Sequence, residues 1–260
     1  MKGKAFRPVC RDEGLGDKGG LDVAEYVNEW GQVVGVPMPG WLARPRPALT
    51  PMDGSFCRVE PLDPERHGRQ LFQSIAEDRD DRTWTYLAYG PFASEDEFLR
   101  WLKGCAASDD PLFHAIVDHA SGTALGLVSF LRIDGAAGSI SIGHIIFSHS
   151  LRQTPAATEG MYLMLRRAFD ELGYRRCEWR CDALNTKSRI AAERFGLRLE
   201  GIFRQAAVSK GRNRDTAFFS MIDAEWPRIR AGFETWLSPG NFDADGRQHQ
   251  RLSALTRPVE

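Results

Sequence analysis

From residue 56 onward, hydrophobic positions follow two spacings along the chain, and these spacings predict a mixture of strands and helices. Short apolar or alternating runs bounded by turn-forming residues are typical of strands, whereas apolar residues three and four positions apart are typical of helices. The run 124–133 is apolar on both faces, which is typical of a central strand. The order of elements predicts an α/β or α+β fold rather than an all-β sandwich. The expected strands cover residues 56–62, 113–117, 124–133, 139–147, 174–183, 197–208 and 215–222, and the expected helices cover 64–76, 95–105, 155–172, 186–195 and 226–236.

Capping residues define the ends of the two helices that follow residue 150. Thr154 precedes a proline, and a threonine N-cap followed by proline at the first helical position is a favourable start. Gly173 suits the left-handed conformation that ends the same helix. Asn185 can cap the next helix, which Gly196 would end. Ser94 is the expected N-cap of the earlier helix 95–105.

The chain is expected to carry extensions on both sides of one compact domain. Residues 1–20 are glycine-rich, charged and without apolar periodicity, so they are expected to form a disordered leader. Residues 21–55 are rich in proline and predict an extended arm, with Trp30 and Trp41 held against an apolar surface. The domain itself is expected at 56–225. A helix and a partly ordered tail, anchored by Phe242 and Leu252, are expected at 226–260.

Composition and charge exclude several classes of function. The 260 residues include 34 Lys+Arg and 35 Asp+Glu, a formal net charge of −1, so bulk charge does not favour a nucleic acid or a membrane surface as partner. No run approaches the length of about 18 apolar residues that a membrane span needs. The five cysteines contain no CxxC pair, which argues against a disulfide framework or a zinc site. We therefore expect a metal-free, cytoplasmic protein.

The junction at residues 147–158 is the strongest candidate for chemistry in the residues alone. No phosphate-binding loop, dinucleotide fingerprint, zinc-protease or serine-hydrolase motif occurs in the chain. At the junction, a strand ends and a helix begins on small residues after Arg152 and Gln153. Unpaired N–H groups and the helix dipole make such a start a general anion site. Alternatively, Ala156 and Ala157 are simply good helix formers, and the junction by itself does not decide between these interpretations.

A spaced set of seven residues between positions 181 and 205 points to a known family. With the strand and helix order around it, the set resembles the GNAT acetyltransferases, specifically the RimJ/RimL-like branch that acetylates protein N-termini or other amines. The resemblance covers about residues 56–224. The matching residues are Cys181, Asn185, Ser188, Gly196, Glu200, Gly201 and Gln205.

The resemblance implies a mixed, mostly antiparallel sheet that splays open between its fourth strand, 139–147, and its fifth strand, 174–183. Acetyl-CoA would enter this gap, with its pantetheine along the strand edge. The pyrophosphate loop of the family falls on residues 152–157, where Pro155 replaces the first glycine and removes one N–H donor. The implied cofactor-binding residues are Ile146, Phe147, Arg152, Gln153, Thr154, Ala156, Ala157, Thr158, Asn185 and Ser188.

The resemblance also implies direct acetyl transfer to a primary amine in a ternary complex. Ser188 falls where the branch places a hydroxyl near the sulfur of CoA. The branch often carries glutamate at the position of Ser141, so the role of general base could pass to His144, whose ordinary pKa suits it, or to a water chain. The candidate catalytic residues are therefore Ser188, His144 and Ser141. His144 could equally be a packing residue. Glu178 is either an acceptor-orienting carboxylate or a solvated charge on the face of a strand.

Aromatic residues between positions 84 and 101 lie where the family builds the wall of the acceptor site, and Tyr86 and Tyr89 are the candidates for substrate contact. An inactive GNAT-fold acyl-CoA-binding or regulatory protein is the alternative, since Pro155 and Ser141 depart from the pattern. A longer acyl donor would require an apolar lining around Val128 and Ile146. The acceptor is not identified by the residues, and a homodimer through the arm or the tail is left open. The aromatic residues are Trp84, Tyr86, Tyr89, Phe92 and Trp101.

Overall fold

The computed structural model describes residues 7–8, 26–76 and 81–257, and the chain divides into two units, residues 1–42 and 43–260. Within the described part of the first unit, β1 (Arg7–Pro8), β2 (Tyr26–Val27) and β3 (Val33–Val34) pair antiparallel. Trp30 is 75% exposed, so the expectation that it is held against an apolar surface is wrong. Most of the expected leader lies outside the described residues.

The second unit is built on a single sheet. Among its described residues, eight strands follow the order β10-β11-β9-β8-β7-β6-β5-β4, antiparallel except for the pair β8 and β9. The strands are β4 (Met52–Asp53), β5 (Cys57–Pro61), β6 (Leu112–Asp118), β7 (Ala124–Asp134), β8 (Ser139–Phe147), β9 (Arg176–Asp182), β10 (Arg198–Ser209) and β11 (Arg212–Ile222). The helices are α1 (Pro64–Ala76), η1 (Arg82–Trp84), α2 (Glu95–Ala106), α3 (Pro155–Arg166), η2 (Arg167–Glu171), α4 (Thr186–Arg194), α5 (Trp226–Leu237), η3 (Pro239–Asn241) and α6 (Leu252–Thr256).

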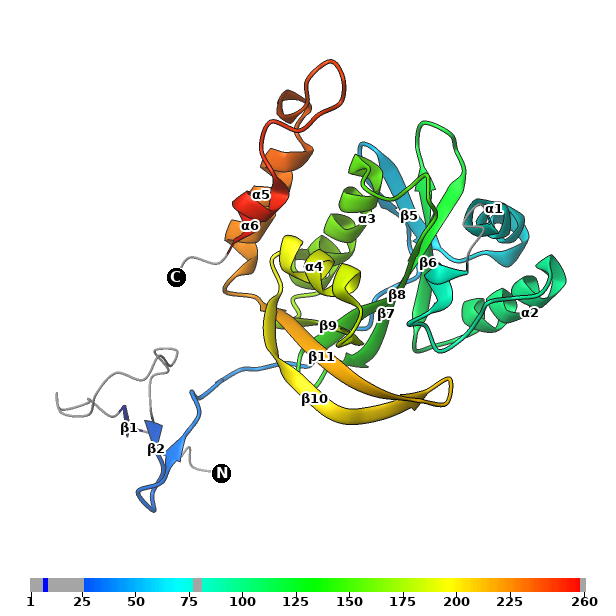
Figure 1. Cartoon of the computed structure of the whole chain (residues 1–260). Coiled ribbons are helices and arrows are strands. Elements are labelled where there is room, and N and C mark those ends of the chain that lie inside the picture. The colour runs from blue at the N-terminus through cyan, green and yellow to red at the C-terminus, as the bar shows by residue number, and fades with distance from the viewer. Residues whose placement is uncertain (1–6, 9–25, 77–80, 258–260) are drawn as a thin grey trace. The chain divides into compact units, whose positions relative to one another are not determined.

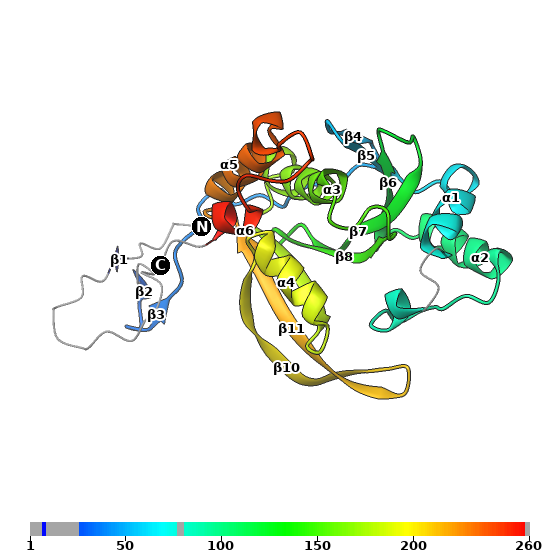
Figure 2. The same ribbon diagram turned by 45° about the horizontal axis from the view of Figure 1, so that its top comes forward.

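Helices cover both faces of the sheet, as Figures 1 and 2 show. Helices α1 and α2 pack on one face, where Leu71 and Phe98 join Leu127 of β7 in one apolar core. Helices α3, α4 and α5 pack on the other face, where Met161 and Phe233 join Val128 of β7 in a second core. Strand β7 therefore faces both cores and lies between β6 and β8, which confirms the prediction of a central strand.

The predicted capping residues occupy the predicted helix starts. Ser94 accepts a hydrogen bond from the N–H of Glu97, and Asn185 accepts one from the N–H of Ser188. The Oγ1 atom of Thr154 accepts the N–H of Ala157 at 3.1 Å. These bonds satisfy N–H groups that the helix itself leaves without partners.

Two elements differ from their predicted boundaries by more than two residues. The helix expected at 155–172 is α-helical to Arg166 and then continues as the π-helical turn η2, whose wider i to i+5 spacing is not encoded in apolar periodicity. Strand β11 begins at Arg212 rather than at residue 215. Lys210 and Gly211 both have positive φ, so a tight two-residue turn joins β10 to β11 where a six-residue connection was expected.

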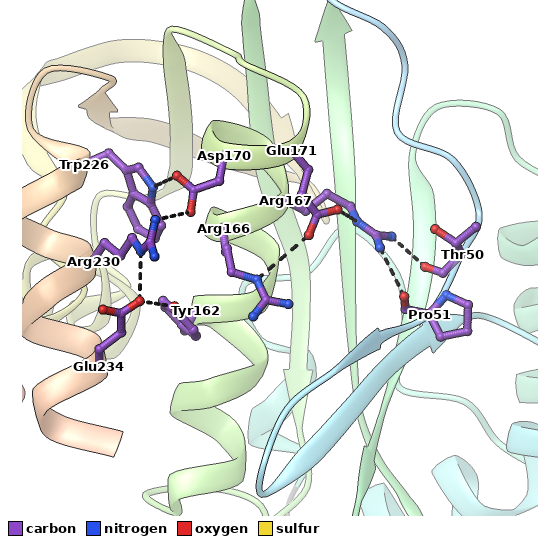
Figure 3. Close-up of polar contacts among 10 residues, drawn as sticks. All are labelled: Thr50, Pro51, Tyr162, Arg166, Arg167, Asp170, Glu171, Trp226, Arg230 and Glu234. Carbon is purple, nitrogen blue, oxygen red and sulfur yellow. Dashed lines mark hydrogen bonds and ion pairs between the residues drawn. The ribbon is translucent and has the colours of Figure 1, made fainter. Parts of the chain in front are cut away.

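Helix α5 is attached to α3 and η2 by a polar network and by stacked rings (Figure 3). The indole N–H of Trp226 donates to Asp170 at 2.7 Å, and Arg230 pairs with the same carboxylate and with Glu234. The hydroxyl of Tyr162 donates to Glu234 at 2.9 Å. Since Trp226 is also 4% exposed, the network surrounds a buried apolar contact.

Residues after α5 return to the same core. Leu252 in α6 is 1% exposed, and the ring of Phe242 lies edge-on to that of Trp236. The hydroxyl of Thr256 donates to the carbonyl of Arg194 at the end of α4. The segment thereby links α4 to α5. Across the described part of the chain, no helix has the length and apolar character needed to cross a membrane.

Candidate active site

The sheet opens between β8 and β9. The two strands pair at three positions, Ser139 with Arg176, Ile140 with Cys177 and Ser141 with Glu178, and no further pair joins them among the described residues. Beyond this vertex, β8 stays paired with β7 as far as Phe147, while β9 stays paired with β11. Figure 2 shows the β10–β11 hairpin diverging from β7 and β8. The backbone edges of β8 and β9 that face the gap can therefore accept an extended ligand.

A break in the regular pleat of β8 accompanies the opening. The register with β7 shifts between Leu127 and Ser129, and His144 opposite this shift has a φ of 49°. A non-glycine residue with positive φ is uncommon within a strand. A bulge bends its strand and re-aims the side chains that follow it, and this one lies just beyond the last pair of β8 with β9.

The loop before α3 closes the end of the gap. Arg152 donates through Nε to the carbonyl of Phe147 at 3.1 Å and through Nη2 to Thr83 Oγ1 at 2.7 Å. Gln153 has a φ of 62°, which places the chain in position for Thr154 to cap α3. The first turn of α3 therefore directs its N–H groups and positive dipole end toward this loop. Two surface hollows of about 300 and 370 Å³ lie beside this turn, both lined by Thr154.

Several of the predicted cofactor-binding side chains point into a core and not into the gap. Ala156 and Ala157 are 4% and 5% exposed, which supports a packing role for their methyl groups. Ile146 is 1% exposed and belongs to the core beneath α1 and α2. Thr158 is 3% exposed and accepts hydrogen bonds from Arg194 of α4. The side chains of these four residues are therefore occupied elsewhere, and the N–H groups of Ala157 and Thr158 are bonded to Thr154.

Asn185 and Ser188 lie at the start of α4, beside the β9 arm. Asn185 is the N-cap of α4, and its amide oxygen accepts the backbone N–H of Ser188. The Oγ atom of Ser188 accepts the indole N–H of Trp179 at 3.0 Å. This bond fixes the oxygen. The hydroxyl also reaches the Cys181 thiol, where burial raises the pKa and the bond from Ser188 acts in the opposite direction.

Glu178 lies at the vertex and is held by arginines of its own strand. Its carboxylate accepts hydrogen bonds from Arg176 at 2.8 Å and from Arg180 at 2.6 Å, and the hydroxyl of Ser141 donates to it at 3.3 Å. Burial opposes its ionisation, but the bonds from the two arginines outweigh this and lower the pKa of the carboxyl. The side chain is 14% exposed, so the interpretation of Glu178 as a solvated charge is wrong.

His144 and Tyr89 meet on the opposite arm. The Nδ1 atom of His144 is 3.0 Å from the hydroxyl oxygen of Tyr89, and the two rings stack with centroids 5.7 Å apart. Burial, and then the charge of Arg132, lower the pKa of His144, so the imidazole is neutral near pH 7. Burial raises the pKa of Tyr89, which keeps the phenol protonated. The structure thus brings together a neutral histidine and a neutral tyrosine beside the gap.

The segment 81–92 spans the site and is bound to several distant elements. The hydroxyl of Tyr86 donates to the carbonyl of Leu184 at 3.2 Å, beyond the end of β9. Lys210, at the tip of the β10–β11 hairpin, donates to the carbonyls of Trp84 at 2.8 Å and Gly90 at 2.6 Å. Sequence reasoning missed Lys210, because nothing in a turn sequence shows what its tip will contact.

Four of the five aromatic residues predicted to form the wall pack together in one cluster, and Tyr86 does not join them. Trp84, Tyr89, Phe92 and Trp101 form edge-on and tilted ring pairs with centroids 4.6 to 6.3 Å apart. Tyr86 lies outside the cluster and is 36% exposed. The predicted catalytic residues do not contact one another in the described chain: Ser141 bonds to Glu178, His144 to Tyr89 and Ser188 to Trp179. No group of three or more metal-binding side chains occurs within residues 26–76 and 81–257.

Comparison with known proteins identifies relatives of this arrangement. Residues 58–198 match the family model of the acetyltransferase (GNAT) domain. A GCN5-related N-acetyltransferase from Brucella melitensis is 45% identical with a TM-score of 0.83, and the match covers 84% of this chain and 99% of that one. A probable acetyltransferase (GNAT family) from Chromobacterium violaceum ATCC 12472 is 44% identical with a TM-score of 0.70, covering 75% and 96%.

More distant relatives share the fold. The microcin C7 self immunity acetyltransferase MccE, whose structure contains acetyl-CoA and AMP, is 18% identical with a TM-score of 0.58, covering 65% of this chain and 93% of that one. No curated protein gives a significant match.

Proposed function

Because the chain belongs to the acetyltransferase (GNAT) family, we propose that it transfers the acetyl group of acetyl-CoA to a primary amine, by direct transfer within a ternary complex. We place it in the RimJ/RimL-like branch on the spaced residues of the 181–205 motif. The observation that carries the proposal is the opening between β8 and β9, which leaves two strand edges unpaired beside the start of a helix. The cytoplasm is the proposed compartment.

The residues around the gap fit acetyl-CoA, which would supply the activated acetyl group. The free edges of β8 and β9 can bind the amide groups of pantetheine as an added strand would. The first turn of α3 and the guanidinium of Arg152 suit the pyrophosphate. Pro155 removes one backbone donor there, and the N–H groups of Ala157 and Thr158 are bonded to Thr154, so we assign more of the phosphate binding to Arg152, Gln153 and the N–H of Ala156. The complex of MccE with acetyl-CoA supports a cofactor of this kind in the shared fold.

We assign the base to His144. The acceptor must lose a proton before its nitrogen can attack the thioester carbon, and a neutral imidazole can receive that proton. The Nε2 atom is available in the tautomer in which Nδ1–H donates to the hydroxyl of Tyr89. Glu178 is a weaker candidate, because its two arginine partners lower its pKa. Ser141 is reassigned from catalysis to positioning, since its hydroxyl donates to Glu178.

Ser188 would stabilise the leaving group. As the new C–N bond forms and the C–S bond breaks, negative charge develops on sulfur, and a hydroxyl donor lowers the energy of that charge. The bond from Trp179 to Ser188 Oγ polarises the hydroxyl and orients its proton away from the indole.

Titration calorimetry with acetyl-CoA tests the cofactor, and detection of free CoA thiol tests turnover. We expect Ser188→Ala to lower kcat by about tenfold to 100-fold with little change in acetyl-CoA affinity, because one transition-state donor is lost. Lys187→Ala, at the exposed neighbouring position, is the matched control. Unchanged turnover in Ser188→Ala would remove Ser188 from the mechanism, and absence of acetyl-CoA binding to the wild-type chain would overturn the proposal itself.

A catalytically inactive acyl-CoA-binding or regulatory protein is the second candidate. Pro155 in the phosphate loop and Ser141 at the usual glutamate position favour it. Binding of acetyl-CoA without thiol release over a broad panel of amines would support this candidate. A longer acyl donor is disfavoured, because Val128 and Ile146 lie in cores on opposite faces of the sheet and cannot line one channel.

A further inference from the structure

The face of β9 that points away from α3 carries alternating charges. Cys177, Trp179 and Cys181 face the core beneath α3 and α4, so Arg176, Glu178 and Arg180 face the other side of the sheet. The guanidinium of Arg180 lies 4.5 Å from the centroid of the Phe218 ring on β11. This is the side of the sheet on which His144 meets Tyr89, away from the helix that would bind the phosphates of the cofactor.

Arg132 approaches the same face from the opposite arm of the gap. It lies in β7 at a register shift, with a φ of 50°. Arg180 of β9 and Arg214 of β11 are near enough that their charges lower its pKa, after burial, while Glu178 and Asp110 act in the other direction. Its side chain makes no hydrogen bond or ion pair with the part of the chain that the structure describes. Arg132 is an exposed residue, so its guanidinium is open to a ligand while it lies near the charges of Arg180 and Arg214.

Arg214 completes the group from β11. By strand alternation it shares the face of Phe218, and its Nε atom is buried without a hydrogen-bond partner among the described residues. The adjacent carboxylate, Asp215, accepts bonds from the N–H of Gln205 and from Asn213. A buried guanidinium N–H without an acceptor is costly unless a ligand supplies one.

The carboxylates near these arginines already accept hydrogen bonds from other groups. Glu178 accepts bonds from Arg176, Arg180 and Ser141. Asp110 accepts the backbone N–H groups of Arg132 and Ile133. Arg132, whose charge acts on His144, and Arg214 therefore leave an excess of positive charge and guanidinium donors on this face.

We propose that the amine acceptor is a small anion, whose carboxylate or phosphate group is bound by Arg132 and Arg214 while its amine points toward His144. This proposal rests on the proposed function, of which it names the substrate class. Arginine suits the role because its planar group of donors matches carboxylate and phosphate oxygens. The same charges repel polyamines and other polycationic amines, which are excluded as substrates.

The test compares amines that differ in charge but little in shape. L-glutamate, L-aspartate and glucosamine 6-phosphate are assayed for CoA thiol release beside L-glutamine, L-asparagine, glucosamine and spermidine. We expect kcat/KM for at least one anionic amine to exceed that of its neutral counterpart by about tenfold to 100-fold, the usual effect of a charge-assisted hydrogen bond. Which anion is preferred distinguishes a carboxylate from a phosphate. Preference for the neutral member of every pair, or for spermidine, would overturn the proposal.

Substitutions of the two arginines test whether these side chains bind the anionic group of the acceptor. Arg132→Gln and Arg214→Gln are expected to raise KM for the anionic acceptor about tenfold while the KM for acetyl-CoA stays unchanged. Arg100→Gln, an exposed position on α2, is the matched control. If both variants keep the acceptor KM of the wild type, the assignment is wrong.

Calorimetry with acetyl-CoA on the same samples separates the two proposals. If acetyl-CoA binds and none of the anionic amines is acetylated, the acceptor proposal fails while cofactor binding stands. If acetyl-CoA itself does not bind, the proposed function fails as well.

Discussion

Two groups of arginines lie on opposite sides of the sheet and differ in how their charges are matched. Between α3, η2 and α5, Arg166, Arg167 and Arg230 each reach a carboxylate, and Arg167 also donates to the carbonyls of Thr50 and Pro51 (Figure 3). On the face of β9 and β11, Arg132 and Arg214 have no such partner in the described chain. A matched group serves to hold elements together, whereas an unmatched group retains donors for a ligand.

The comparison predicts that the matched side carries the stability of the fold. Trp226→Ala removes a 4% exposed side chain that stacks on Phe169 and Tyr162 and donates to Asp170. We expect the free energy of unfolding, measured in urea, to fall by about 3 to 5 kcal/mol. Trp30→Ala, at a 75% exposed position, is the control and should change it by less than about 0.5 kcal/mol. A small effect of Trp226→Ala would mean that α5 is not required to stabilise α3.

The core on the α3 side should also make the fold sensitive to acid. His114 is fully buried against Phe130, and burial lowers its pKa to about 4, with the charge of Arg167 acting in the same direction. The unfolded chain takes up this proton below about pH 6.5, whereas the folded chain does so only near pH 4. Stability is therefore complete above pH 6.5 and falls by about 3 kcal/mol from this group as the pH drops toward 4.

Urea unfolding at a series of pH values measures this loss. His114→Gln should flatten the dependence between about pH 6.5 and 4, and His249→Gln, at an exposed position, should leave it as in the wild type. An equal slope in His114→Gln and the wild type would show that other groups cause the acid sensitivity.

A pair of single substitutions compares the two groups most directly. Asp170→Ala leaves the indole N–H of Trp226 and the guanidinium of Arg230 without their acceptor, so we expect a loss of about 1 to 3 kcal/mol in unfolding free energy. Arg214→Gln removes a charge without a partner and should change stability by no more than about 0.5 kcal/mol in either direction. Equal losses from the two substitutions would make Arg214 a structural residue and remove the distinction.

Much of the fold follows from local patterns along the chain. The helix 64–76 and the strand 139–147 have the predicted bounds, because apolar spacing and turn residues act within a few positions of one another. Thr154, Asn185 and Ser94 cap their helices for the same reason. The resemblance that led to the GNAT family is likewise carried by a short, spaced motif, and the comparisons agree with it at the level of the family.

The contents of the candidate site were less predictable. Trp30 was expected to be covered and is exposed. Of the two interpretations of Glu178, the solvated charge is wrong, because its side chain is 14% exposed and pairs with Arg176 and Arg180. The hydroxyl of Ser188 was assigned from its position in a motif, but its bond to Trp179 depends on how β9 packs against α4. Each of these outcomes depends on contacts between segments that the local pattern does not relate.

The amino-acid pattern was sufficient for the order of strands and helices, for the caps and for the family, since these depend on period, turn chemistry and short motifs. The influence of the Arg214 charge on Arg132, the hydrogen bond from Lys210 to Trp84 and the pairing of His144 with Tyr89 required the folded chain. Strand register and the bulge at His144 set which side chains share a face, and the separation of β8 from β9 sets which donors keep no partner. These are long-range geometric properties, and a change of one residue in register would move every side chain of a strand to the other face.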